Sequence, residues 1–105
     1  NNHYWSGEPA QYYNKLVDAS FAPDYRQGGG EHLIDYPGVY NYCVAVDYNP
    51  ECIVGKGSAI FLHCSGKSTT AGCISIPENN MITVLQNLRS DAEIIIDYEC
   101  NLGLY

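Results

Sequence analysis

The chain has 105 residues, enough for one domain with a single modest hydrophobic core. Its formal net charge is −7 and it holds only five lysines and arginines, too few for the basic stripe of a nucleic-acid-binding surface. No run approaches the roughly 18 apolar residues of a membrane-spanning helix. The sequence therefore predicts a single domain over residues 1–105, with no nucleic-acid partner and no transmembrane segment.

The first thirty residues have little regular pattern. Residues 11–18 favour a short helix, and residues 27–30 have the composition of a flexible loop. The start of the chain lacks the basic end and the apolar stretch of a signal peptide. We therefore expect residues 1–30 to be an irregular N-terminal extension, or the remnant of a region that precedes this domain.

Three strands are predicted further along the chain. Residues 42–48 are aromatic and β-branched and end at Asn49-Pro50, where proline removes an N–H donor and starts a turn. Residues 58–64 form a second short apolar run. A third strand is expected at residues 92–98, with Ile95 doubly flanked by apolar residues as in a buried central strand.

One helix is predicted at residues 77–89. Pro77 suits the first turn, and Glu78 complements the positive end of the helix dipole. A single apolar stripe follows at positions i, i+3, i+4 and i+7, formed by Met81, Val84, Leu85 and Leu88. The predicted fold class is thus mainly β with one packed helix.

A histidine and a cysteine stand where cysteine chemistry would need them. His63 ends the apolar run at 58–64, and Cys73 follows Gly72 after a polar loop. A thiolate is the nucleophile in cysteine enzymes, and a nearby imidazole holds it ionised and then handles protons for the leaving group. A glycine before the nucleophile lets backbone N–H groups turn toward a developing oxyanion. We expect His63 to keep Cys73 ionised at neutral pH.

Side-chain alternation distinguishes the two cysteines near His63. A strand at 58–64 places Phe61 and His63 on one face and Cys64 on the other, so Cys64 would point away from its neighbour. Cys73 can return to His63 across the loop. The plain alternative is a half-buried histidine with an unrelated core cysteine, because such pairs are common.

The segment GSAIFLHC…TAGCISIPENNM resembles the catalytic region of the L,D-transpeptidases, the YkuD-like family, in its subgroup with Thr-Ala-Gly-Cys at the nucleophile. The similarity covers roughly residues 31–96 and includes YNYCVAVDYN at 40–49 and GKGSAIFLH at 55–63. By this resemblance His63 is the catalytic base, Cys73 the nucleophile, and the backbone of Gly72 and Cys73 the oxyanion site. The resemblance also implies a β-sandwich catalytic domain and export to a bacterial cell envelope, this chain then being a mature or trimmed form.

The chain departs from the family pattern beside the nucleophile. The wider family often has Ser-His-Gly-Cys followed, one residue on, by Arg or Asn, whereas this chain has Thr70-Ala71-Gly72-Cys73 and then Ser75. No second histidine lies beside the nucleophile, and no guanidinium is available there to bind a substrate carboxylate. Ser75 is kept as a candidate supporting residue.

Glu31, His32 and Asp35 cluster before the strand predicted at 42–48. The resembling family places this region near the active cleft, so one of them could orient His63 or bind a substrate amine. The alternative is a solvated loop. Glu31 and His32 are therefore candidate supporting residues.

The five cysteines allow one reactive thiol and four others, namely Cys43, Cys52, Cys64 and Cys100. These four could form up to two disulfides or could all be reduced and packed, and the sequence leaves both open. No Cys-x-x-Cys pair is present and His63 and Cys64 would face opposite ways, so no metal site is expected.

The resemblance implies acyl transfer on peptidoglycan stem peptides. Cys73 would attack the carbonyl of an L-configured diamino acid centre joined to D-Ala and form a thioester. An acceptor amine would then give a cross-link, and water would give L,D-carboxypeptidase activity; neither route needs a cofactor. Two other classes stay open: a general cysteine peptidase that uses the same dyad, and a non-catalytic wall-binding module. Histidine before cysteine is the reverse of the papain-like order, and a module without catalysis would tolerate loss of either residue.

Overall fold

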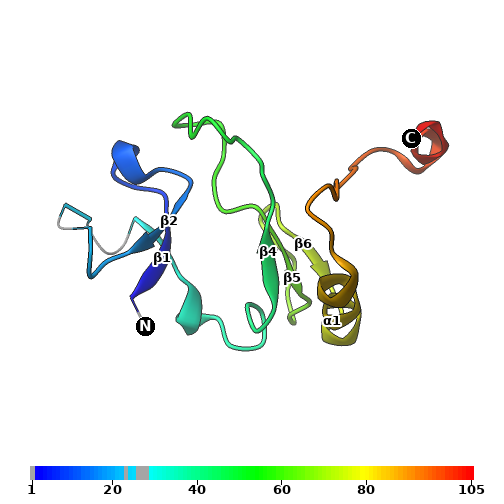
Figure 1. The fold of residues 1–105 in the computed structure, drawn as a ribbon, viewed down its shortest axis with the longest axis horizontal. Coiled ribbons are helices and arrows are strands. Elements are labelled where there is room, and N and C mark those ends of the chain that lie inside the picture. Colours follow the sequence, from blue (N-terminus) through cyan, green and yellow to red (C-terminus); the bar gives the residue numbers. More distant parts are fainter. Residues whose placement is uncertain (1, 23, 26–28) are drawn as a thin grey trace.

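A computed structural model describes residues 2–22, 24–25 and 29–105, which form two three-stranded sheets and one α-helix. Figure 1 shows them as layers, with the N-terminal strands on one side, a second sheet in the middle and the helix beyond it. The prediction of a mainly β fold with one helix is confirmed.

The N-terminal sheet contains β1 (His3–Ser6), β2 (Lys15–Asp18) and β3 (Gly30–His32). β1 lies in the centre and pairs antiparallel with both neighbours. The expectation of an irregular extension over residues 1–30 is therefore wrong where the chain is described. Residues 27 and 28 of the loop predicted at 27–30 lie outside the described residues.

The helix predicted at residues 11–18 does not form. A 3-10 turn, η1 (Ala10–Tyr12), is followed by Asn14 and then directly by β2. Asn14 has a φ of 57°, a left-handed conformation that asparagine tolerates but that ends any right-handed helix. The segment reverses direction there and becomes a hairpin.

The second sheet has the order β4-β5-β6, with β4 (Cys43–Ala45), β5 (Phe61–Cys64) and β6 (Ile74–Ile76). β5 is antiparallel to β4 and parallel to β6. The strands predicted at 42–48 and 58–64 are present but shorter. One cause is that Ala59 has a φ of 58°, which is incompatible with an extended strand.

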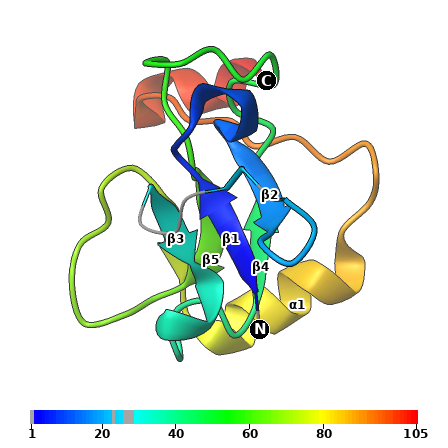
Figure 2. The same ribbon diagram turned by 90° about the vertical axis from the view of Figure 1, so that its left-hand side faces the viewer.

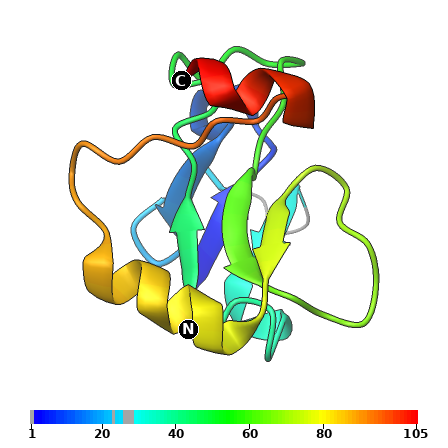
Figure 3. The ribbon, with the colours of Figure 1, turned by 90° about the vertical axis from the view of Figure 1, so that its right-hand side faces the viewer.

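The predicted helix is α1 (Glu78–Asn87), preceded by Pro77. Met81 is fully buried, and the helix contacts β5 and runs transverse to the strands in Figure 3. The stripe holds only in part, because Leu88 lies beyond the last helical turn with 45% of its surface exposed.

The prediction of a strand at residues 92–98 is wrong. This segment runs extended without a strand partner among the described residues and leads to a 3-10 helix, η3 (Glu99–Leu104), far from the N-terminal sheet in Figure 1. Ile96 is 76% exposed. The solvent-accessible surface of 7504 Å² exceeds the about 5,800 Å² of a compact monomer of this mass, and the exposed apolar side chains of this segment contribute to the excess. An apolar run favours burial, but it becomes buried only where another part of the fold provides a surface to pack against.

The two sheets face each other through aromatic side chains. Figure 2 shows β1, β2 and β3 lying over β4 and β5. The ring of Trp5 on β1 stands edge-on to Phe61 on β5, with centroids 5.0 Å apart, and Phe61 is almost fully buried. Such edge-to-face pairs add about 0.5–1.5 kcal/mol beyond the area that they bury. Among the described residues, no helix combines the length and the apolar composition needed to cross a bilayer.

Asn14 joins the N-terminal hairpin to the chain that leads into β5. Its side-chain oxygen accepts hydrogen bonds from the indole N–H of Trp5 at 3.1 Å and from the backbone N–H of Ala59 at 3.2 Å. Its side-chain nitrogen donates to the carbonyls of Tyr48 at 2.8 Å and Asn49 at 3.0 Å. One amide therefore satisfies groups from three separate parts of the chain.

We expect Asn14→Ala to lower the free energy of unfolding by about 2–4 kcal/mol, because it leaves partly buried donors and acceptors without partners. Asn14→Gly keeps the positive φ without strain and should cost nearly as much, which separates lost hydrogen bonds from backbone effects. Urea denaturation measures both. The control is Asn87→Ala, which removes an exposed bond within α1 and should cost under about 1 kcal/mol. A loss below about 0.5 kcal/mol for Asn14→Ala would contradict this role.

Candidate active site

Cys73 lies one residue before β6, at the end of an exposed polar loop. Its sulfur donates a hydrogen bond to the carbonyl oxygen of Ala59 at 3.2 Å and accepts one from the backbone N–H of Phe61 at 3.4 Å. The side chain is half-buried. The thiol therefore lies against the residues that begin β5, the strand that carries His63.

His63 is buried in β5, and a backbone carbonyl determines its protonation pattern. Its Nδ1 lies 2.8 Å from the carbonyl oxygen of Cys64. A carbonyl can only accept, so Nδ1 carries the hydrogen and Nε2 of the neutral ring is left as the basic nitrogen. The ring of Tyr40 stands at 90° to the imidazole with centroids 5.5 Å apart, which limits its rotation.

The strand register places the dyad on one face. β5 and β6 pair His63 with Ser75, and Cys73 precedes Ser75 by two positions, so all three share a side of the sheet. Cys64 is buried on the opposite side, where its sulfur lies 3.6 Å from the carbonyl of Tyr42. The alternation predicted from the sequence is confirmed for His63 and Cys64.

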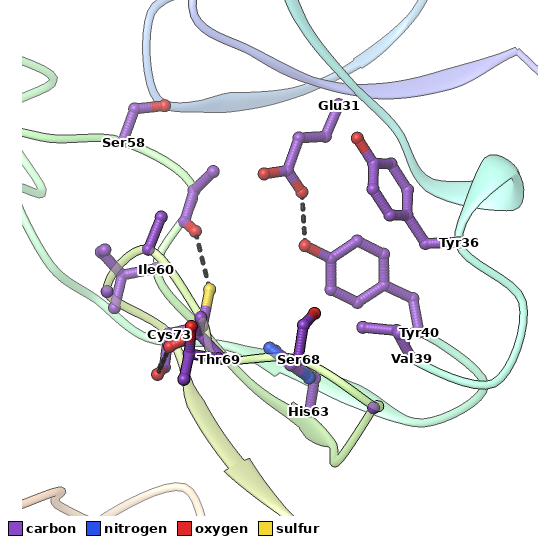
Figure 4. Close-up of a pocket in the computed structure, with 15 residues that line it drawn as sticks. Glu31, Tyr36, Val39, Tyr40, Ser58, Ile60, His63, Ser68, Thr69 and Cys73 are labelled. Carbon is purple, nitrogen blue, oxygen red and sulfur yellow. Dashed lines mark hydrogen bonds between the residues drawn. The ribbon is translucent and has the colours of Figure 1, made fainter.

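His63 and Cys73 line one cavity of about 280 Å³, shown in Figure 4, which we call the active-site cavity. Its walls come from β3 and the turn after it, from the run entering β5, and from the loop before β6. The lining residues are Glu31, Tyr36, Val39, Tyr40, Ser58, Ala59, Ile60, His63, Gly66, Ser68, Thr69, Thr70, Ala71, Gly72 and Cys73. The volume lies just below the usual range for small-molecule sites.

Glu31 and Tyr40 form a hydrogen-bonded pair across this cavity. The Tyr40 hydroxyl donates to the carboxylate of Glu31, as Figure 4 shows. Burial of the phenol, followed by its bond to Glu31, raises the pKa of Tyr40 well above the ordinary tyrosine value. Tyr40 therefore stays protonated and remains a donor at any pH at which the protein would work.

The other two candidate supporting residues lie elsewhere. His32 follows Glu31 on β3 and faces the opposite way, where it stacks on Tyr4 with centroids 4.3 Å apart and lies 3.0 Å from the carboxylate of Asp35. Ser75 is exposed and is not among the residues that line the cavity. Of the cluster at 31–35, the structure brings only Glu31 to the dyad.

The surroundings of Cys73 favour the protonated thiol, whereas the sequence predicts an ionised one. Burial raises the pKa of Cys73, the N–H of Phe61 opposes that rise, and the negative charge of Glu31 adds to it. Its sulfur donates to a carbonyl, a bond that only the protonated form makes. His63 can therefore act as a general base that removes the proton during attack, and not as the partner of a preformed ion pair.

Two backbone positions beside the thiol have unusual conformations. Gly72 has a φ of 150°, which glycine adopts readily, and a Cβ built there would lie 3.4 Å from the side chain of Ile60. Ala59, whose carbonyl holds the thiol, has a φ of 58°, rare for an alanine. The Thr70 hydroxyl donates to the carbonyl of Cys73 at 2.6 Å and closes the turn. Strained backbone of this kind is concentrated at functional sites.

Sequence reasoning missed Ala59 and Tyr40 as parts of the site. Ala59 was expected within a strand, where its φ would be negative, and Tyr40 preceded the predicted strand at 42–48. Tyr40 lies in the resembling segment, which was the one signal available. Tyr40 reaches His63 because of the turn at residues 33–39. Its hydrogen-bond partner, Glu31, lies on β3 of the N-terminal sheet.

All five cysteines carry free thiols, which is the reduced arrangement of the two left open. Among the described residues, no group of three or more histidine, cysteine, aspartate or glutamate side chains is placed to hold a metal ion.

Comparison with known proteins gives no relative: no family model matches the chain, and neither a curated protein nor a solved structure matches it.

The rate of Cys73 alkylation by iodoacetamide should rise with pH to a midpoint above the ordinary cysteine pKa of about 8.5, because only the thiolate reacts and its pKa is raised. Glu31→Gln should lower that midpoint, and Glu51→Gln, an exposed carboxylate outside the cavity, should not. Mass spectrometry of the tryptic peptide 68–89, in which Cys73 is the one cysteine, follows the reaction. A rate that stays flat between about pH 6 and 8 would show an imidazole-ionised thiolate instead.

Proposed function

We propose that this protein is an acyltransferase of the L,D-transpeptidase type, acting on peptidoglycan stem peptides outside the cytoplasm, with its two sheets arranged as the β-sandwich of that family. The observation that carries the proposal is that Cys73 and His63 line the same cavity. The carbonyl of Cys64 leaves the basic Nε2 of that histidine available. The resemblance of the segment from Gly57 to Met81 supplies the substrate class.

Acylation needs three actions from the site. As the sulfur of Cys73 bonds to the carbonyl carbon of the diamino acid, Nε2 of His63 takes the thiol proton. The carbonyl oxygen becomes an oxyanion, which the backbone N–H groups of Gly72 and Cys73 would stabilise. The tetrahedral species then expels the D-Ala amine, which takes the proton from His63. A thioester on Cys73 and a free D-Ala result.

The second half-reaction determines the product. An acceptor amine that attacks the thioester gives a new peptide bond and returns a proton to the sulfur, which forms a cross-link. Water in the same position gives a shortened stem, the L,D-carboxypeptidase outcome. Both outcomes use the same dyad, and the chemistry of neither requires a metal or an organic cofactor.

The resting hydrogen bond from Cys73 to Ala59 suits this mechanism. A protonated thiol is less open to alkylation and oxidation than a thiolate. Attack requires the sulfur to leave the carbonyl of Ala59 and present its proton to His63. Substrate binding in the cavity is the event that would bring the two together, because apo catalytic contacts often tighten only in the complex.

Cys73→Ala should abolish turnover of a stem peptide, and His63→Ala should lower it by about 10²- to 10⁴-fold, because the thiol loses both its base and the proton donor of the leaving group. The matched control is Cys64→Ala, which removes a buried thiol from the opposite face. It should cost about 1–2 kcal/mol of stability and retain activity in the folded fraction. Activity that is lost in a folded Cys64→Ala but kept in Cys73→Ala would overturn the assignment.

A second test uses β-lactams. A thiolate that acylates at an L-centre, as the resembling family does, should be acylated by carbapenems and by few ordinary penicillins. Intact-protein mass spectrometry should show one carbapenem added, absent in Cys73→Ala and present in Cys64→Ala. A general cysteine peptidase has no reason for this preference, and a binding module would form no adduct. Absence of any adduct on folded, reduced protein would count against the proposal.

A further inference from the structure

Glu31 gives the active-site cavity a negative charge that no lysine or arginine among its described lining residues balances. Among the described residues that line it, Glu31 is the single carboxylate, and no lysine or arginine is present. The remaining lining side chains are aromatic, aliphatic or hydroxyl-bearing apart from the dyad. A substrate carboxylate entering this cavity would therefore meet a like charge and no cationic partner.

The carboxylate is held in place, and its charge reaches the sulfur. Tyr40 donates a hydrogen bond to one oxygen of Glu31, which leaves the other oxygen without that bond. The charge of Glu31 is one of the causes that raise the pKa of Cys73, so the two groups act on one another across the cavity. Figure 4 shows the carboxylate pointing into the space bounded by Tyr40, His63 and Cys73.

The charge of Glu31 does not favour ionisation of the Cys73 thiol. A carboxylate that raises the pKa of a nucleophilic cysteine makes the thiolate less abundant at neutral pH. Its hydrogen bond to Tyr40 could be made as well by a neutral glutamine. Glu31 is half-buried in the wall of the cavity, and a carboxylate in that position attracts a cation.

We propose that Glu31 makes the active-site cavity a binding site for a primary ammonium group and is the residue that selects an amine as acyl acceptor over water. The second part rests on the acyl transfer proposed above. The reacting nitrogen must come within about 3–3.5 Å of the thioester carbon on Cys73, so the acceptor amine has to enter this cavity. The departing amine of the first half-reaction leaves from the same position.

The proton balance of the transfer is simple. The acceptor enters as an ammonium ion held by Glu31 and gives one proton to Nε2 of His63, which is neutral once D-Ala has departed. The free amine attacks the thioester carbon, its C–N bond forms and the C–S bond breaks. The leaving sulfur takes the proton from His63, and the second amine proton is released to water.

The charge preference can be measured without any wall substrate. Two methanethiosulfonate reagents form a disulfide with a thiolate and release methanesulfinate: the 2-aminoethyl reagent is cationic and the 2-sulfonatoethyl reagent is anionic. The ratio of their rates at Cys73, read on the tryptic peptide 68–89 and normalised to a free cysteine peptide, reports the local charge. The thiolate fraction cancels in this ratio.

Glu31→Gln keeps an oxygen acceptor for Tyr40 and removes only the charge. We expect it to lower the cation-to-anion ratio by about fivefold or more, whereas Glu51→Gln should leave the ratio unchanged. With a stem-peptide donor and a free amine, Glu31→Gln should also lower the proportion of aminolysis to hydrolysis. A role for Glu31 limited to holding Tyr40 predicts no change in either quantity.

The two proposals fail separately. An unchanged ratio in a Glu31→Gln protein that still forms the Cys73 carbapenem adduct overturns the ammonium site and leaves the acyl transfer standing. A lowered ratio in a protein that neither carbapenem nor stem peptide acylates supports the ammonium site and overturns the acyl transfer. A lowered ratio with unchanged partition between amine and water overturns the selection of the acceptor.

Discussion

The side-chain amide of Asn14 is the contact on which the rest of this structure depends. Its hydrogen bonds connect the N-terminal hairpin to the carbonyls of Tyr48 and Asn49 and to the N–H of Ala59. Ala59 in turn presents its own carbonyl to the thiol of Cys73. The first strands of the chain are thus linked to Cys73 through Asn14 and Ala59.

The packing of the two sheets also brings Glu31 into the cavity that His63 and Cys73 line. Glu31 belongs to β3 of the N-terminal sheet, whereas Cys73 and His63 belong to the second sheet. A cavity between two sheets can combine a carboxylate, a thiol that is hydrogen-bonded to a backbone carbonyl, and a histidine whose tautomer is set by another carbonyl. The thiol and the imidazole are held by backbone carbonyls and the carboxylate by the Tyr40 hydroxyl, so their relative positions depend on the packing of the two sheets, to which Trp5 and Phe61 contribute.

The sequence predicts the parts of this molecule that depend on local pattern. Alternation along β5 correctly separates His63 from Cys64, and the apolar spacing around Met81 correctly locates α1. The N-terminal strands were missed because β3 is distant in sequence from β1 and because Asn14 reverses the chain into a hairpin where a helix was expected. The strand expected around Ile95 was wrong for the opposite reason: its composition is typical of a strand, but no edge receives it among the described residues.

The protonation state of the thiol shows the limit of motif reasoning most clearly. A histidine near a cysteine suggests an ion pair, yet burial and Glu31 raise the pKa of Cys73, and the carbonyl of Ala59 accepts its hydrogen. None of these effects can be read from the spacing of His63 and Cys73, because they come from residues 12 or more positions away in sequence that fold around the sulfur. The proposed role of His63 as a general base rests on these effects.

The central claim is that Cys73 carries out acyl transfer between peptide stems, and the most direct measurement is mass spectrometry of purified stem peptides incubated with the protein in ¹⁸O-labelled water. The account predicts loss of the terminal D-Ala, a covalent intermediate on the peptide 68–89, and products joined by a new peptide bond without label alongside shortened stems that carry ¹⁸O. Stem peptides that remain unchanged with folded, reduced protein, or cleavage at other bonds without an intermediate on Cys73, would contradict it.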